Sequence, residues 1–372
     1  MQTQRPPRLL TPFLTLSLLL AVASPALGQR GIDYLVQIQG EVYIRQNRAS
    51  QRASSGKLVR TEQTIEVKPN GQVTLVCSNH TRHLLHPGTY AVRDYCPAAP
   101  ARNRSARSQT TRGGWLRNGT RGTFDAAQPY VLSPRHTALL SPDQVLIQWH
   151  PVDQARGADQ AQVTVRGSGV KWTIATPLGQ IPYGGSSPLL PNYTYTITVE
   201  QGGKVSRASF VVLPPAERDR VNAEVAQVQA LGLDPDGAAI GIALVYLNYQ
   251  NPDLNYRSPA LNLDALEVLQ SRTEAGSRNT QVYLLQAEAY LAMDLPLEAR
   301  QTLEQSLGLA QANDDSEAIA QSYWGLGTIA TRQGDRAAAR GFLQQALEIY
   351  QALGDEEQIQ GIQKDLRNLG EG

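Results

Sequence analysis

The C-terminal part of the chain repeats itself every 40 residues, and this periodicity restricts its fold more than any other feature. A shift of 40 positions superposes 279–312 on 319–352, and the second repeat extends to 353. Residues that then coincide are Tyr283 and Tyr323, Ala299 and Ala339, Arg300 and Arg340, Leu303 and Leu343, Gln305 and Gln345, Leu307 and Leu347, Gln311 and Gln351, and Ala312 and Ala352. Self-similarity at about 20–50 residues is typical of a solenoid. We therefore expect helix pairs that stack on one another.

The residue types at the repeated positions suit a stack of helical hairpins. Small residues stand where the two helices would touch, a turn residue separates the helices, and a large apolar residue fills the seam. The small residues are Ala287 and Gly327 on the first helices and Ala299 and Ala339 on the second helices. The turn residues are Asp294 and Gly334, and the large apolar residues are Leu303 and Leu343. This order resembles the tetratricopeptide pattern over 279–353. The sequence departs from the tetratricopeptide pattern in two ways: its second helix, 336–353, is longer, and the terminal Pro is missing.

The resemblance implies a concave face, lined by the first helix of each pair, that holds an extended peptide or a helix. Transferred position by position, the partner-binding residues are Gln281, Leu284 and Glu288 in one repeat and Gln321, Trp324, Thr328 and Arg332 in the next. Trp324 is the strongest candidate, because a large aromatic residue in a groove is a typical anchor. Packing of Trp324 against the neighbouring helix pair is the alternative, and the sequence leaves both open.

The array as a whole is predicted to span 214–372. An earlier, degenerate pair occupies 238–249 and 263–271 and carries an insert at 250–262, and a helix at 217–231 leads into it. The final apolar stripe has helical spacing, which is expected of a helix that caps a solenoid. Its residues are Ile359, Ile362, Leu366 and Leu369.

Before the array, the apolar period falls to two residues, which predicts two small all-β units at 29–98 and 128–213. In the first unit, the strand-like runs are 34–38, 42–44, 64–67, 72–77 and 89–92. The order of Gly40-x-Val42, Asn70-Gly71 and Leu85-His86-Pro87-Gly88 resembles the extracytoplasmic domain of FecR-like proteins, in particular the disulfide-bearing versions common in cyanobacteria. FecR relays a signal through a membrane helix, and this role is not transferred because no later segment could span a bilayer.

The second unit has strand-like runs at 145–149, 162–165, 171–176, 195–200 and 208–213, as expected of a small sandwich. Leu189-x-Pro191-Asn192-Tyr193-x-Tyr195 resembles the corner of fibronectin type III domains, although Asn and Tyr replace Gly and Thr. The resemblance implies that Trp149 fills the core. The lead-in at 129–135 is similar to that of cyanobacterial envelope proteins that pair a FecR-like domain with such a module.

Residues 1–28 are typical of a secretory signal peptide. Arg5 and Arg8 precede an apolar run at 13–22, and Ala26-Leu27-Gly28 places small residues before a cut at Gln29. We expect a periplasmic or secreted protein, with an uncleaved anchor as the alternative. Export would oxidise the only two cysteines, Cys77 and Cys96, to a disulfide.

Net charge divides the chain in two. From 29 to 213 there are 21 Lys+Arg and 10 Asp+Glu, which gives +11, and from 214 to 372 there are 11 and 23, which gives −12. Six of the arginines lie in 99–127, whose composition predicts a flexible linker. The opposite charges indicate two units with different surfaces, and the basic one would suit an anionic polymer or be a solvated face.

No sequence motif for catalysis or for a cofactor emerges, so we expect neither an enzyme nor a cofactor. The spacing Cys77-x2-His80-x2-His83-x2-His86 suggests zinc, but Cys77 is assigned to the disulfide and His83 and His86 would point to opposite faces of a strand. His136 and His150 have no obvious carboxylate partner in the sequence. The main hypothesis is therefore an extracytoplasmic adaptor that binds an envelope protein through its repeats. The alternative is a binder of envelope glycan or another anionic polymer through the basic half, with repeats that self-associate; neither hypothesis involves nucleic acid.

Overall fold

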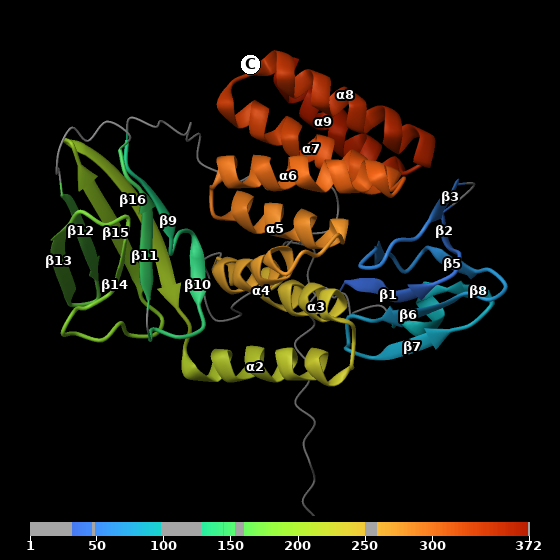
Figure 1. The fold of residues 1–372 in the computed structure, drawn as a ribbon, viewed down its shortest axis with the longest axis horizontal. Helices are drawn as coiled ribbons and strands as arrows, with labels where there is room; N and C mark the ends of the chain where they lie inside the picture. Colours follow the sequence, from blue (N-terminus) through green and yellow to red (C-terminus); the bar gives the residue numbers. More distant parts are fainter. Residues whose placement is uncertain are drawn as a thin grey trace, which may run out of the picture.

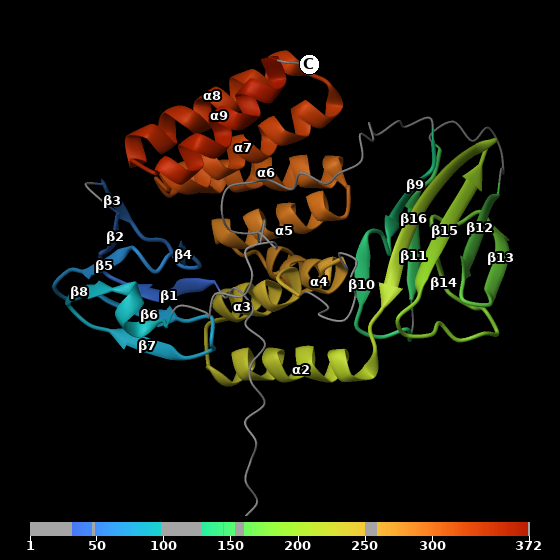
Figure 2. The same cartoon turned by 180° about the vertical axis from the view of Figure 1, so that it is seen from behind.

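The helices stack into one array, and the two β units lie on opposite sides of it (Figure 1). This computed structural model describes residues 32–46, 49–97, 128–143, 145–152, 160–249 and 259–370. Seen from behind, the array still separates the two β units (Figure 2). The predicted fold class, two small all-β units followed by a helical-hairpin repeat solenoid, is confirmed as an all-β region followed by a run of helices.

The first β unit consists of two four-stranded antiparallel sheets that enclose an apolar core. One sheet has the strand order β4-β1-β6-β7 and the other has the order β3-β2-β5-β8. The core includes Leu35, Ile65 and Leu75, all fully buried. The elements are β1 (Asp33–Gln39), β2 (Val42–Gln46), β3 (Ala49–Arg52), β4 (Leu58–Val59), β5 (Thr64–Val67), β6 (Gln72–Val76), β7 (Arg82–Leu85), β8 (Gly88–Ala91) and the short helix α1 (Val92–Tyr95).

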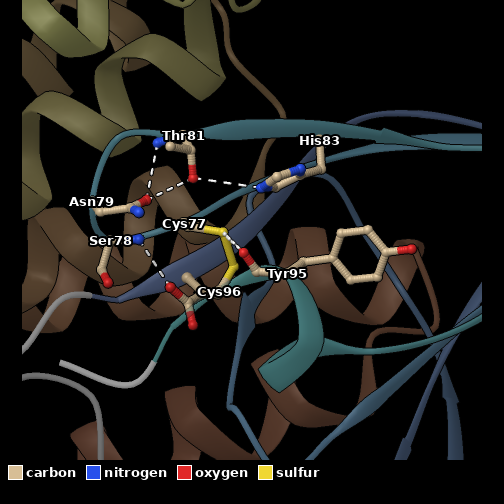
Figure 3. The surroundings of a disulfide bond; sticks show 8 residues. Cys77, Ser78, Asn79, Thr81, His83, Tyr95 and Cys96 are labelled. Atoms are coloured by element: carbon tan, nitrogen blue, oxygen red, sulfur yellow. Dashed lines mark hydrogen bonds between the residues drawn. A yellow bond between two sulfur atoms is a disulfide. The ribbon is translucent and has the colours of Figure 1, made fainter.

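The predicted disulfide between Cys77 and Cys96 is present and buried, and it ties the end of β6 to the end of α1 (Figure 3). The Cα atoms of the two cysteines are 5.3 Å apart. Beside it, the backbone N–H of Ser78 donates to the Asp33 carboxylate at 2.9 Å. Both sulfur atoms are held in the disulfide, so they are not available as thiolate ligands to a metal.

The second β unit is a sandwich of a five-stranded sheet, β10-β16-β15-β12-β13, and a three-stranded sheet, β14-β11-β9. Trp149 lies in its core, as predicted, together with Phe210 and Tyr195. The Tyr195 hydroxyl accepts a hydrogen bond from the Leu190 backbone N–H at 2.6 Å, which closes the predicted corner. The strands are β9 (Tyr130–Ser133), β10 (Thr137–Leu139), β11 (Leu146–His150), β12 (Ala161–Gly167), β13 (Val170–Thr176), β14 (Gln180–Pro182), β15 (Thr194–Gln201) and β16 (Lys204–Val212).

The array contains each of the predicted helices. They are α2 (Pro215–Ala230), α3 (Pro235–Leu247), α4 (Asn262–Glu274), α5 (Thr280–Ala292), α6 (Pro296–Ala312), α7 (Ser316–Gln333), α8 (Arg336–Leu353) and α9 (Glu356–Gly370). Gly327 is small for the predicted reason, since a Cβ there would lie 2.9 Å from Leu343 Cγ on the second helix. Asp294 occupies the α5–α6 turn with φ of 57°, the unusual backbone angle expected of that position.

The strands that sequence periodicity missed are short or polar. They include β3, β4, β7 and β14, in which few side chains are buried and no clear alternation marks the strand. None of the described helices is long and apolar enough to cross a bilayer. The predicted signal peptide at 1–28, the linker at 99–127 and most of the insert at 250–262 lie outside the described residues.

Candidate functional site

The seven predicted partner-binding residues follow one stripe along α5 and α7, but none of them is fully exposed. Gln281, Leu284 and Trp324 are buried. Glu288, Gln321, Thr328 and Arg332 retain partial exposure. We call these last four residues the α5–α7 face. Glu288 and Thr328 occupy equivalent places in the two repeats because they are 40 positions apart.

Trp324 packs inside the array, which is the alternative that the sequence left open. Its side chain is 1% exposed. The indole Nε1 donates to the Asp365 carboxylate of α9 at 2.9 Å, and its ring meets Tyr350 of α8 edge-on at 6.3 Å between centroids. Leu284 is likewise part of the core between successive repeats. An anchor role for Trp324 stays a prediction, and it would require α9 to move.

The polar groups of the α5–α7 face are already engaged in part. Thr328 Oγ1 donates to the Trp324 carbonyl at 3.0 Å, and Gln321 Nε2 donates to the Glu317 carboxylate at 3.1 Å. Burial raises the pKa of Glu288 well above its usual range and lowers the pKa of Arg332. The raised pKa favours the protonated carboxyl group of Glu288, which can donate a hydrogen bond as well as accept one.

The first β unit contacts the array where the first helices begin. The Lys57 ammonium pairs with Glu317 at 2.6 Å, and the Ser54 hydroxyl donates to Asp315 at 2.7 Å. Asp315 is also the N-cap of α7, since it accepts from the Ala318 backbone N–H at 3.1 Å. One carboxylate thus caps the helix and fixes the neighbouring β unit.

A second ion pair joins the same β unit to the start of α9. Arg60 Nη1 lies 2.9 Å from the Asp355 carboxylate. Asp355 lies in the turn between α8 and α9. The Lys57 pair at the start of α7 and the Arg60 pair at the start of α9 therefore connect the β unit to both ends of the α7–α8 segment.

Apolar contact completes this interface. Tyr34 and Val36 of β1 belong to the same core as Ile240 of α3. Gly56 has φ of +87°, and a Cβ at this position would lie 2.6 Å from Ile240 Cδ1 and 3.0 Å from Gln281 Cβ. The loop can approach the helices only because it has no side chain there. The β unit therefore covers the beginning of the predicted partner-binding stripe.

The sandwich contacts the opposite edge of the array, and a buried arginine forms the centre of that interface. Arg135 Nη2 pairs with Asp294 at 2.7 Å, with 7% and 6% of the two side chains exposed. Its Nε donates to the Met293 carbonyl at 2.9 Å, and its guanidinium lies 4.6 Å from the centroid of the Tyr130 ring. The Tyr130 hydroxyl in turn donates to the Asp294 carbonyl. Such a buried pair holds together only when each charge is fully paired.

Backbone bonds extend this interface to the α3–α4 connection. Ala138 N–H of β10 donates to the Ala260 carbonyl at 3.0 Å, and Asn262 donates from its amide to the His136 carbonyl at 2.9 Å. The Leu263 backbone N–H donates to Thr137 Oγ1 at 3.1 Å. Edge strand β10 and the start of α4 thus satisfy one another's polar groups.

The expectation that His150 has no carboxylate partner is wrong. Its Nε2 lies 3.1 Å from the Glu298 carboxylate at the start of α6. The two residues are 148 positions apart, so no local pattern reveals the pair.

Ion pairs connect the basic half of the chain to the acidic array. Lys57, Arg60 and Arg135 come from the basic half, and each pairs with a carboxylate of the acidic array. At these three places the basic and acidic surfaces complement one another within one molecule. The net charges of +11 and −12 in the sequence predict two surfaces of opposite sign, but they do not show that these surfaces meet inside the molecule.

The interface between sandwich and array also contains a partly open cavity of about 420 Å³. Its apolar walls come from both sides and include Leu132 and Leu140 of the sandwich and Leu266 of α4. Asp264, in the first turn of α4, lies in its lining. Burial, together with the nearby Glu267 carboxylate, raises the pKa of Asp264 to about 7.

Comparison with known proteins addresses the repeats. Residues 279–352 match the tetratricopeptide repeat family. This match covers α5 to α8, the segment in which the 40-residue period is clearest. Because tetratricopeptide arrays present surfaces to other proteins, the repeats support a role in protein–protein interaction. A search of the curated proteins finds no match to this chain.

Proposed function

We propose that this protein is an extracytoplasmic scaffold that holds another envelope protein on the α5–α7 face of its repeat array. The observation that carries the proposal is the tetratricopeptide match over 279–352. The 40-residue period supports the choice of surface, because Glu288 and Thr328 then stand at equivalent positions of two successive first helices, the helices expected to line the concave face.

The positions of the two β units support the α5–α7 face, rather than the edges of the array, as the partner-binding surface. The first β unit contacts the beginning of α5 and α7 through Gly56 and Lys57. The sandwich contacts the end of α5 through Arg135 and Asp294. Both edges of the array are thus used within the molecule, and the α5–α7 face lies between them. A rigid array costs less ordering entropy when it binds, which favours a preorganised partner site.

The proposed location rests on two features of the sequence. The pattern at 1–28 is that of a signal peptide, and Cys77 and Cys96 form a disulfide of the kind that persists in oxidising compartments. A β half of FecR-like and fibronectin-like type would then position the array in the envelope. Identification of the N-terminus of exported protein tests this part: a chain that begins at Gln29 supports it, and one that begins at Met1 contradicts it.

The binding test should use the whole mature chain. Val36 of β1 and Ile240 of α3 share one core, so a cut between the halves would expose apolar surface on both. We expect the immobilised mature protein to capture a defined protein from envelope extract, both at about 0.1 M salt and at about 1 M salt. Capture of glycan or another anionic polymer, lost at the higher salt, would instead favour the basic half as the binding part.

A further inference from the structure

The outer face of the five-stranded sheet in the sandwich is polar and open to solvent. Its strands β12 and β13 lie on the side of the sandwich remote from the array (Figures 1 and 2). Side chains alternate between the two faces of a strand. Val163 of β12 and Ile197 of β15 point into the core, so their sequence neighbours point outward. These outward side chains are exposed or partly exposed.

The pairing of β13, β12, β15 and β16 arranges the outward side chains in rows across the sheet. One row consists of Thr173, Thr164, Thr198 and Arg207, and the next consists of Lys171, Arg166, Thr196 and Ser209. Neighbouring strands are about 4.8 Å apart, and successive rows are about 7 Å apart. Two hydroxyls of the first row are in contact, since Thr164 Oγ1 lies 3.1 Å from Thr173 Oγ1. The two rows thus carry three cations and five hydroxyl groups.

Two of the cations stand directly opposite each other. Arg166 and Lys171 are cross-strand partners of β12 and β13, and both are exposed. Neither forms an ion pair with any described residue. The two-residue turn at Ser168 and Gly169, both with positive φ, fixes this register. Like charges directly opposite each other destabilise an antiparallel pair, and an anion between them would remove the repulsion. The pair therefore points to a negatively charged ligand.

The third cation indicates that this ligand is a polymer. Arg207 lies two strands and one row away from Arg166, a separation of about 12 Å. A single small anion does not reach both groups, whereas a chain with repeated negative charges does. Glu200 is the one acid among the described outward residues of these four strands, and it lies about 14 Å from Arg166. The face is therefore positive over both rows.

The hydroxyl groups favour a carbohydrate over other anionic polymers or surfaces. A Ser or Thr hydroxyl both donates and accepts hydrogen bonds, as a sugar hydroxyl does. The two rows contain no aromatic residue on which a nucleic-acid base could stack. They also contain no large apolar residue that could enter a lipid bilayer.

We propose that this sheet face binds an acidic polysaccharide, with its negative groups on Arg166, Lys171 and Arg207 and its hydroxyls on the threonines of the same two rows. The face is separate from the α5–α7 face, so the proposal does not depend on the proposed function. Polymer binding here would accompany the capture of a protein by the repeats and would not replace it.

Fluorescence anisotropy of labelled polysaccharides with the full mature chain tests the proposal. The probe is alginate, which carries a carboxylate on each sugar, and labelled dextran is the neutral control. We expect alginate to bind at about 0.1 M salt and to bind at least tenfold more weakly at about 1 M salt, while dextran does not bind. Binding to phosphatidylglycerol vesicles without binding to alginate would assign the cations to a lipid surface and overturn the proposal.

Substitutions then separate a ligand role from a merely solvated face. The double variant Arg166→Gln with Lys171→Gln should weaken alginate binding at least tenfold. Its matched control is Arg340→Gln with Lys364→Gln, which removes the same charge from exposed positions of the array and should change the affinity less than twofold. Both variants alter only exposed side chains, so their urea denaturation midpoints should not fall.

Three results would overturn the proposal. They are unchanged alginate affinity in the folded Arg166 and Lys171 double variant, an equal loss of affinity in both double variants, and no binding of alginate to the unmodified chain at about 0.1 M salt. The first would show that Arg166 and Lys171 are solvated charges, and the second would show that alginate senses only the net charge of the molecule.

Discussion

Replacement of Arg135 by Met should weaken the interface between the sandwich and the array without disturbing the core of either unit. Met preserves much of the aliphatic stem but removes the ion pair with Asp294 and the bond to the Met293 carbonyl. Breaking one partner of a buried ion pair costs about 3–5 kcal/mol. The Arg332 charge also acts on Asp294 and offsets part of the loss, so we expect a decrease of about 3 kcal/mol in the free energy of unfolding.

Urea denaturation followed by circular dichroism measures this decrease, with Arg166→Met as the matched control. Arg166 lies on the exposed side of β12 in the same sandwich, and its replacement should change stability by less than about 0.5 kcal/mol. Asp294→Asn, which tolerates the φ of 57°, completes a double-mutant cycle. The double variant should lose less than the sum of the single losses. Equal denaturation midpoints for Arg135→Met and Arg166→Met would refute the assignment of Arg135 as the centre of the interface.

Three further predictions concern stability. Trp324→Ala should lower the free energy of unfolding by about 3–5 kcal/mol in urea titrations, because it leaves a cavity beneath α9 and removes the hydrogen bond to Asp365. A loss of less than about 1 kcal/mol would contradict the packing of Trp324 in the core. Asp264 binds a proton in the folded state between pH 3.8 and about 7, so its stabilising contribution is present at low pH and lost as the pH rises through 7. Denaturation midpoints at pH 5 and pH 8 should therefore differ less in Asp264→Asn than in the unmodified chain, and an equal difference would contradict the raised pKa. Replacing both Cys77 and Cys96 by Ser should lower the free energy of unfolding by about 3 kcal/mol, because the disulfide joins residues 19 positions apart. Urea denaturation of the first β unit measures this loss, and an unchanged midpoint would contradict a stabilising disulfide.

The array could be predicted from sequence because its determinants are local and periodic. Gly327 and Asp294 follow from the chemistry of a tight helix contact and of a turn, and both recur at a fixed spacing. Trp324 could not be assigned in the same way. A large aromatic residue in a helical stripe satisfies a groove and a core equally well, and only the position of α9 distinguishes the two.

The interfaces between units could not be predicted, because their residues are far apart in the sequence. Arg135 and Asp294 are 159 positions apart, and Lys57 and Glu317 are 260 apart (317 minus 57). Net charge indicated that two surfaces of opposite sign exist, but not that they meet. The cavity beside Asp264 is formed by both sides of such an interface, so it too has no signature in the sequence.

Site-specific photo-cross-linking in the exported, full-length protein tests the central claim most directly. One cross-linking amino acid replaces Thr328 on the α5–α7 face, and another replaces Arg340, which is exposed on α8 of the same repeat. The account predicts that the probe at position 328 captures one envelope protein and that the probe at 340 does not. Capture of that protein from position 340, with none from 328, would contradict it.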